Sequence, residues 1–347
     1  MSIIPSTRLK VVSVHKLKTM TCYRKYYWRY VLNLESKAMN LNFWYGGVLG
    51  AGFEAILQGQ DWKAAMLDEH EKRCAGLSIN SDLVAEMDLQ YRLIEAILAG
   101  ARRQAAVKQM TLTESQVPIR LRLRDSDVLY CGTADGIGDW KQIRSLFEVK
   151  TASRVNAAYL SALSFDPQIY SYAMTPATRG CFQCAYCIFT KTQRRVKRRQ
   201  TIDDFVEEIT DDIVMRPDMY YQWHKVSLGK ATLETNRQDV EATAAIMQRQ
   251  FDDLGDRVLD YSRWPKQPDK CFEYAGCEFL PLCKNAATWQ HYLRMYRQRT
   301  ILYEEERAEL VTDRVAPISS SITKKKVNKA TKSVVKKKVK ATKSPKS

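Results

Sequence analysis

The first third of the chain carries apolar residues at helical spacing. Residues 8–35 predict a helix rich in lysine and aromatic side chains, and residues 43–58 predict a second helix that four glycines weaken. Residues 61–110 continue the pattern and place Leu89 and Leu93 on one helix face. We therefore expect a mainly helical N-terminal region.

The spacing of apolar residues then changes from helical to alternating, which is typical of half-buried strands. Asp166 followed by Pro167 marks the start of a helix, because aspartate caps helix N-termini and proline fits the first helical position. The predicted strands span residues 117–124, 127–138, 143–152 and 180–191, and further helices span residues 166–174 and 202–214. This order predicts an α/β fold with a central mixed sheet flanked by helices.

Composition and pattern divide the chain into four regions. We expect a helical N-terminal region at 1–115, an α/β core at 116–215, a helical C-terminal region at 216–315 and a Lys-rich tail at 316–347. The tail lacks the apolar residues needed for a core, so we expect it to be disordered.

The formal net charge of +16 is concentrated at the end of the chain. Residues 319–347 contain eleven lysines and no acid, so without them the charge falls to +5. Such a tail attaches to nucleic acid without sequence preference. A structural, chromatin-like protein led by this tail is therefore a competing interpretation, although the tail itself cannot be catalytic.

The chain lacks the signals of a membrane or secreted protein. No apolar run is long enough for a membrane span, and the N-terminus has no apolar segment of the secretory type. We expect a cytoplasmic, reducing location. The nine cysteines are then thiols or metal ligands rather than disulfides.

Two acids and a lysine stand on neighbouring predicted strands. Glu148 and Lys150 are two residues apart and therefore project from the same face. Residues 136–144 form a connection short enough for an antiparallel hairpin, which would bring Asp135 beside Glu148. Two close carboxylates repel each other, and Mg²⁺ or Mn²⁺ relieves the repulsion.

A lysine next to such an ion can orient a water or stabilise charge on a phosphate. The trio of Asp135, Glu148 and Lys150 therefore favours phosphodiester hydrolysis. The alternative is a surface hairpin with an ordinary ion pair. Gln168 and Tyr172 lie four residues apart on the next predicted helix and share a face.

Together these residues resemble the PD-(D/E)XK nuclease superfamily, and within it the RecB-like branch. The resemblance implies a restriction-endonuclease-like fold and a DNA exonuclease that acts on single strands or DNA ends. Asp135 and Glu148 would hold Mg²⁺ or Mn²⁺, and Lys150 would position the attacking water. Gln168 and Tyr172 would contact the DNA beside the metal.

One position departs from the family pattern. A histidine normally ligates metal from the helix before the core, but the stretch "GGVLGAGFE" places Gly50 there. Glu54 remains and can supply a carboxylate. A catalytically inactive DNA-binding protein on a nuclease fold is therefore the main alternative.

Four cysteines match a further feature of this branch. Cys271, Cys277 and Cys283 follow the core at equal spacing, and Cys22 precedes it in "TCYRKYYWRYV". The segment resembles members such as AddB-type and CRISPR-associated exonucleases, in which one cysteine before the core and three after it hold a [4Fe–4S] cluster. Four thiolates suit such a cluster, with Zn²⁺ as the alternative. The usual spacing is shorter between the first two C-terminal cysteines.

The other cysteines are interpreted as packing residues. Cys181, Cys184 and Cys187 are three apart on a predicted strand, so neighbouring thiols point to opposite faces and cannot converge. Cys74 and Cys131 stand alone in the sequence and are likewise assigned to packing.

A basic run follows the fourth predicted strand and suits a DNA backbone. A solvated loop is the alternative. Its candidate DNA-binding residues are Lys191, Arg194, Arg195, Lys197, Arg198 and Arg199. The resemblance implies a bacterial or phage setting and a role in recombination, repair, DNA processing or CRISPR spacer capture. The residues do not choose among these pathways.

Overall fold

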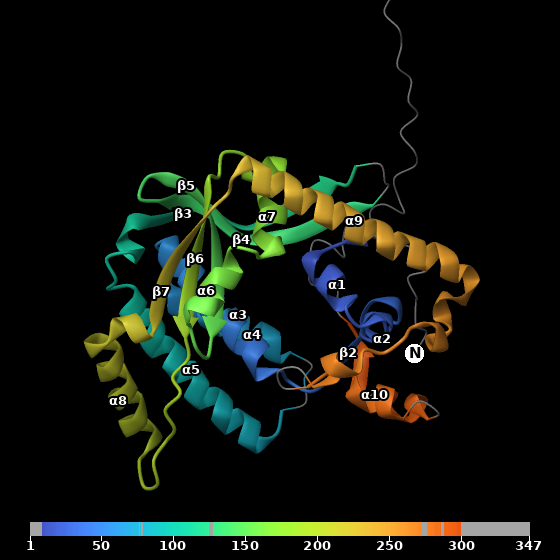
Figure 1. The fold of residues 1–347 in the computed structure, drawn as a ribbon. Helices are drawn as coiled ribbons and strands as arrows, with labels where there is room; N and C mark the ends of the chain where they lie inside the picture. Colours follow the sequence, from blue (N-terminus) through green and yellow to red (C-terminus); the bar gives the residue numbers. More distant parts are fainter. Residues whose placement is uncertain are drawn as a thin grey trace, which may run out of the picture.

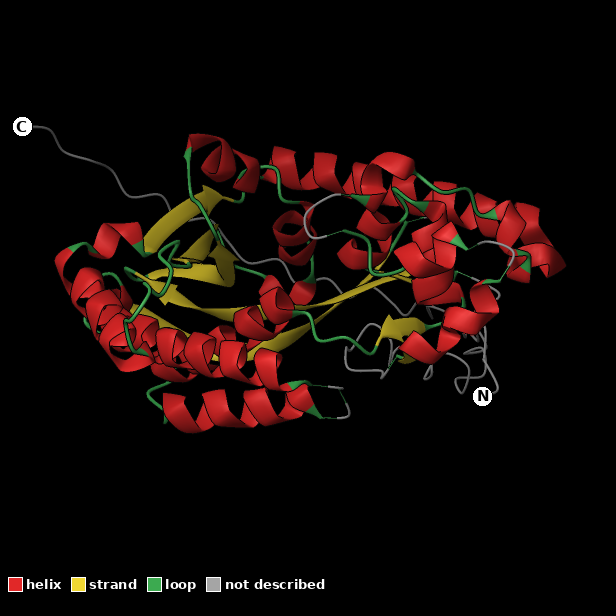
Figure 2. Ribbon diagram, turned by 90° about the horizontal axis from the view of Figure 1, so that it is seen from below, coloured by secondary structure: helices red, strands yellow, loops and turns green. Residues whose placement is uncertain are grey.

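The computed structural model describes residues 9–299 apart from residues 76, 78, 125–127, 273–275 and 286–287. In this range the chain has the expected α/β architecture, with a mixed six-stranded sheet between helices (Figure 1). A mainly helical part lies beside the sheet (Figure 2). The tail predicted to be disordered lies outside the described residues.

The sheet has the order β1-β4-β5-β6-β7, and β3 pairs with β4. The β1–β4 and β5–β6 pairs are parallel, whereas β3–β4, β4–β5 and β6–β7 are antiparallel. The strands are β1 (Val11–Val12), β3 (Met110–Arg122), β4 (Leu129–Trp140), β5 (Ile143–Ala152), β6 (Gln183–Thr190) and β7 (Tyr221–Ser227).

Side chains of β6 alternate between two hydrophobic cores on opposite faces of the sheet. Cys184 and Tyr186 belong to one core, and Ala185 and Cys187 belong to the other. A strand buried on both faces needs an almost continuous apolar sequence, which β6 has. The alternation also separates Cys184 from Cys187, as the sequence predicted.

Helices cover both faces of the sheet. The core that contains Tyr186 is covered by α1, α2, α6, α7 and α9, and the opposite core is covered by α3, α4, α5 and α8. The helices are α1 (Val14–Thr19), α2 (Tyr23–Tyr26), α3 (Leu41–Leu57), α4 (Trp62–Cys74), α5 (Ser81–Ala101), α6 (Ala157–Leu163), α7 (Pro167–Ala173), α8 (Ile202–Met215), α9 (Lys230–Leu254) and α10 (Leu280–Lys284). None of the described helices is long and apolar enough to cross a membrane.

Short helical turns complete the connections. A π-helical turn, η1 (Tyr27–Val31), follows α2. The 3-10 turns are η2 (Val107–Gln109), η3 (Pro176–Thr178), η4 (Pro217–Met219), η5 (Gly255–Leu259), η6 (Tyr261–Arg263), η7 (Pro268–Cys271) and η8 (Trp289–Met295).

The single helix predicted over residues 8–35 is wrong. The segment begins with β1, which pairs with the start of β4 and is therefore extended. Ser13 then caps α1 by accepting a hydrogen bond from the Lys16 backbone N–H (3.2 Å), and Cys22 precedes α2. Sheet pairing and a new cap thus override the helical spacing.

The remaining predicted elements are present with shifted ends. The predicted helix at 61–110 divides into α4 and α5, and its last residue, Met110, already starts β3. Asp166 caps α7 and Pro167 is its first residue, as predicted. β7 adds a strand beyond residue 215, because its antiparallel pairing with β6 extends the sheet.

A tight turn at Lys141 and Gln142 joins β4 to β5. Both residues have positive φ (53° and 64°), as a two-residue type I′ hairpin requires. The predicted end of this strand at Gly138 is therefore wrong, since β4 continues to Trp140. Gly138 instead allows close approach to β3, because a Cβ there would collide with the backbone oxygen of Thr111.

The two ends of the described chain pack together. A second sheet pairs β2 (Leu34–Ser36) with β8 (Tyr296–Gln298) in antiparallel register. The ring of Tyr26 stacks on Trp264 with centroids 5.9 Å apart, and Arg24 Nε donates to the Trp264 carbonyl (2.5 Å). Packing and hydrogen bonds therefore join the N-terminal segment to the Cys-rich segment.

Candidate active site

The candidate site lies where β5 separates from β4. β3 pairs with β4 along one edge of β4. On the other edge of β4, β5 pairs only with Gly136–Trp140, and β1 pairs only with Leu129 and Tyr130. Asp135 lies at the point of separation. Its Oδ2 accepts a hydrogen bond from the Val149 backbone N–H (2.8 Å). This bond replaces the next backbone hydrogen bond between β4 and β5.

Glu148 and Lys150 project from β5 into this region, as the sequence predicted. Glu148 is 3% exposed, and its Oε1 accepts hydrogen bonds from Lys150 Nζ (2.6 Å) and from Gln168 Nε2 (3.0 Å). Gln168 is brought here by α7. The other oxygen, Glu148 Oε2, is buried and has no hydrogen-bond partner among the described residues.

The carboxyl groups of Asp135 and Glu148 are both costly to ionise where they stand. Burial and the Glu148 carboxylate raise the pKa of Asp135 to about 8, against the opposing effects of the Val149 N–H and Lys150. Burial also raises the pKa of Glu148, although Lys150 opposes the shift. Burial disfavours the charged form of Lys150, but Glu148 and Asp166 outweigh it and raise the lysine pKa. A divalent cation would stabilise both carboxylates.

Glu54 and Tyr172 occupy different positions around these groups. Glu54 Oε2 accepts a hydrogen bond from Gln116 Nε2 (3.0 Å), and its charge acts on Asp135 and raises its pKa. Glu54 therefore faces the site from α3. The ring of Tyr172 is buried against β4, where a Cβ on Gly132 would lie 2.7 Å from its Cε1.

Gly50 leaves open space on the same face of α3. One turn earlier, a Cβ on Gly46 would lie 3.6 Å from Thr151 Oγ1 of β5, and one turn later stands Glu54. A Cβ at Gly50 would meet no atom within 4 Å. The helix thus faces the site, but its middle position carries no ligand.

Three residues that the sequence did not assign to the site also belong to it. Asp166 was expected only as a helix cap, yet its Oδ2 lies 3.7 Å from Lys150 Nζ and its Oδ1 lies 3.6 Å from Lys18 Nζ. His15 stands one turn before Lys18. His15 is exposed, but desolvation by the atoms packed around it and the nearby cations Lys18, Arg29 and Lys150 lower its pKa to about 4.

No short-range signal in the sequence links α1 to this site. His15 and Lys18 precede Lys150 by more than a hundred residues, and α1 reaches the site only because β1 joins the edge of β4. For Asp166 the sequence contains a weak indication that it belongs to the site, because it directly precedes the helix that contains Gln168.

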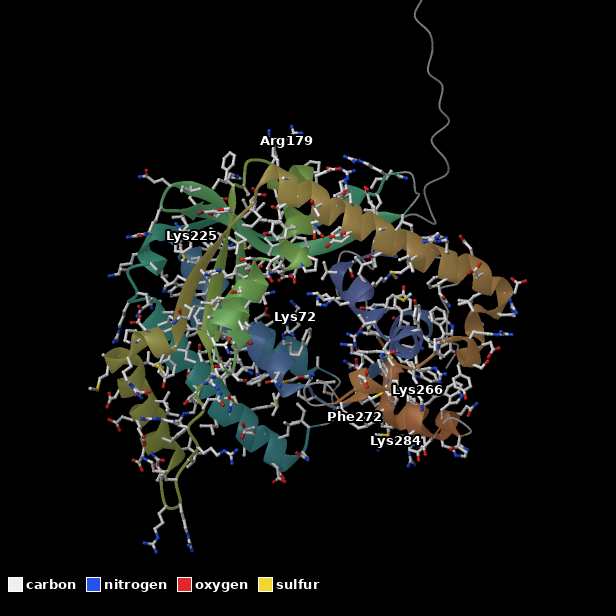
Figure 3. The ribbon with its side chains drawn as sticks, viewed as in Figure 1. Lys72, Arg179, Lys225, Lys266, Phe272 and Lys284 are labelled. Atoms are coloured by element: carbon white, nitrogen blue, oxygen red, sulfur yellow. The ribbon has the colours of Figure 1, made fainter. Side chains whose placement is uncertain are left out.

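The four cysteines expected to hold a cluster lie in one part of the molecule. The Gln267 backbone N–H donates to Cys22 Sγ (3.5 Å), and Cys271 Sγ donates to the Gln267 carbonyl (3.7 Å). The charges of Cys22 and Cys271 act on Cys283, whose pKa burial raises. Lys266, Phe272 and Lys284 mark this region in Figure 3.

The thiols are not arranged as a ligand set in the structure. Within the described residues, no group of three or more His, Cys, Asp or Glu side chains has a metal-binding geometry. The donor chemistry nevertheless suits a cluster, since all four are thiols. The Trp28 indole N–H lies beside Cys283 and favours the thiolate of that cysteine, although burial raises its pKa overall.

The other cysteines pack in the interior or beside it. Cys184 and Cys187 are buried on opposite faces of β6, and burial raises the pKa of both. Cys131 packs against Val11, and Cys74 lies within 4.0 Å of the His70 ring.

The basic run after β6 forms an exposed loop. Lys191 Nζ is held by Asn42 Oδ1 (2.8 Å) and lies 4.0 Å from the Tyr45 ring centroid, and burial lowers its pKa to about 8. Arg194 and Lys197 pair with Glu208 of α8 at 2.8 and 3.1 Å. Arg195, Arg198 and Arg199 make no ion pair with a described residue and remain exposed.

No protein-family model and no curated protein matches this chain.

Proposed function

We propose that this protein is a metal-dependent nuclease that hydrolyses phosphodiester bonds in DNA, on a fold of the restriction-endonuclease type. The convergence of Asp135, Glu148 and Lys150 at the separation of β4 and β5 carries the proposal. A buried glutamate oxygen that has no hydrogen-bond partner in the described part of the chain, next to a second acid of raised pKa, is an arrangement that a cation completes.

Asp135 and Glu148 would hold Mg²⁺ or Mn²⁺, with Glu54 as a further carboxylate beside Asp135. Such an ion supplies an activated water and neutralises charge on the phosphate. Lys150 is held by Glu148 at 2.6 Å and by Asp166 at 3.7 Å, so its ammonium is fixed where a phosphate oxygen or water would approach. Gln168 restrains Glu148 through its amide.

The cysteine region has a structural part in this proposal. Cys22, Cys271, Cys277 and Cys283 would hold a [4Fe–4S] cluster, or Zn²⁺ as the alternative, and thereby fasten the N-terminal segment to the C-terminal one. Stacking of Tyr26 on Trp264 already brings these segments together. A metal group there would act as a staple that strengthens this contact.

A second candidate is a DNA-binding protein that does not cut. The open space at Gly50 favours it, because the helix that faces the site contributes no ligand at that position. The basic loop and the Lys-rich tail would serve either function equally well.

A cleavage assay separates the two candidates. Anaerobically purified protein would be incubated with end-labelled single-stranded and double-stranded DNA and Mg²⁺ or Mn²⁺. Lys150→Ala should abolish cutting, whereas Lys225→Ala, at an exposed position of β7 (Figure 3), should retain it. Binding of DNA without metal-dependent cutting by the unmodified protein would reject the nuclease in favour of the second candidate.

A further inference from the structure

Two aromatic side chains stand beside the charged groups on the segment between β5 and α7. Tyr159 of α6 is partly buried, and the charges of Lys150, Asp166 and Glu148 all act on its hydroxyl. Phe165 follows the end of α6, and its side chain is 81% exposed. The segment that leads from β5 to Asp166 therefore carries one partly buried ring and one exposed ring.

The exposure of Phe165 is built into its loop. The Phe165 backbone N–H donates to the Ala162 carbonyl (3.0 Å), and the Asp166 N–H donates to the Leu163 carbonyl (3.2 Å). These bonds continue the turn of α6 and direct Leu163 into the core, where it is 6% exposed. The ring of Phe165 consequently stays in solvent although the backbone around it is fixed.

Phe165 is also next to the ion-pair network of the site. Asp166, the following residue, lies 3.6 Å from Lys18 Nζ and 3.7 Å from Lys150 Nζ. Lys18 itself is 56% exposed, so its ammonium is open to a ligand. An exposed ring one residue from the partner of an open cation is the combination found on surfaces that bind single-stranded nucleic acid, in which bases stack on rings and cations hold the backbone.

Three other phenylalanines in the described part of the chain are exposed, and Phe272 among them lies in the cysteine region, away from the candidate active site. Phe43 is covered by the Arg73 guanidinium, 4.9 Å from its ring centroid. Phe182 is 71% exposed but precedes Gln183, which pairs with Ser145 at the start of β5 rather than with the end that carries the site. Phe182 is therefore a matched control for an exposed ring away from the site.

We propose that Phe165 and Lys18 form a subsite for one nucleotide of a single DNA strand, with the unpaired base stacked on Phe165 and its phosphate at Lys18. A base within a duplex is already stacked and paired, so the subsite selects single strands or frayed ends. This inference rests on the proposed function for the identity of the ligand, and it names which form of DNA the site takes.

The test measures binding without cleavage. Fluorescence anisotropy of a labelled oligothymidine and of a blunt hairpin duplex would be recorded with the full chain in EDTA. Phe165→Ala should weaken binding of the single strand on the order of tenfold and leave the duplex almost unchanged. Phe165→Tyr should restore single-strand binding, and Phe182→Ala should have no effect.

A series of oligonucleotides with one abasic position locates the base. At one position the missing base should weaken binding to the unmodified protein as much as Phe165→Ala does, and it should cause no further loss in that variant. Equal losses at every position, an equal loss with Phe182→Ala, or unchanged single-strand binding by Phe165→Ala would each overturn the inference. If the unmodified protein cuts DNA and Phe165→Ala binds single strands normally, the subsite alone is overturned. If single-strand binding depends on Phe165 but the unmodified protein cuts no DNA, the nuclease alone is overturned.

Discussion

The carboxylate of Asp166 lies 3.7 Å from the ammonium of Lys150 while its other oxygen accepts a hydrogen bond from the Gln168 backbone N–H (3.1 Å). One side chain thus starts α7 and fixes the lysine of the candidate site. This arrangement explains how a helix cap and the site geometry depend on each other.

Substitutions of Asp166 should separate these two roles. Asp166→Asn keeps an oxygen for the cap and removes the charge, so its free energy of unfolding should stay near that of the unmodified protein while the rate of DNA cleavage falls. Asp166→Ala loses the cap as well and should be less stable by about 1 kcal/mol. Urea unfolding and cleavage rates measure the two effects. Full activity in Asp166→Asn would contradict a role in fixing Lys150.

Stability should depend on pH through Asp135. Its pKa is about 8 in the folded protein, above the value of about 4 expected in an unfolded chain. Between these pH values the folded state binds a proton that the unfolded state has lost, so the free energy of unfolding falls as pH rises. In EDTA, Asp135→Asn should remove much of this decline and be more stable than the unmodified protein near pH 8. Asp139→Asn, on the same strand, is the matched control, and an unchanged slope in Asp135→Asn would refute the assignment.

Divalent metal should stabilise the protein through the same carboxylates. Mg²⁺ or Mn²⁺ binds the folded state, so the melting temperature should rise with metal concentration. The rise should be larger at pH 8 than at pH 6, because the metal competes with the proton held by Asp135. Neither Asp135→Asn nor Glu148→Gln should show this rise in melting temperature with metal. An equal rise in both variants would place the metal elsewhere.

Two glycines should respond in opposite directions to alanine. At Gly50 there is open space, so Gly50→Ala should stabilise α3 by roughly 0.5–1 kcal/mol. At Gly138 the added Cβ meets the β3 backbone, so Gly138→Ala should be clearly less stable. Gly50→His should fold and bind Mn²⁺ more tightly than Gly50→Ala in a calorimetric titration. Equal Mn²⁺ affinity in the two Gly50 variants would show that this position does not face the metal.

The cysteine region gives a prediction that does not depend on cleavage. Anaerobic preparations should contain iron and absorb visible light, and Cys277→Ala should lose both and melt at a lower temperature. Cys74→Ala, on α4 beside His70, should keep the colour and the iron. Zinc in place of iron in the colourless protein would identify the alternative metal, and an unchanged melting temperature in Cys277→Ala would argue against a staple.

Much of the fold and part of the site followed from local patterns. Alternating apolar residues identified the second half of β3, and Asp166 with Pro167 located the start of α7. The two-residue spacing of Glu148 and Lys150 placed both side chains on one face. These features depend on neighbours in sequence, where periodicity and capping act directly.

The sequence alone therefore determined the α/β class, the two faces of its central strands and the pairing of Glu148 with Lys150. Only the tertiary structure decided that residues 8–35 are not one helix, because β1 gains its hydrogen bonds from β4. The same pairing carries Lys18 to Asp166, and the loop bonds leave the preceding residue, Phe165, exposed. Contacts between residues so distant in sequence arise from packing and sheet pairing, which no local pattern encodes.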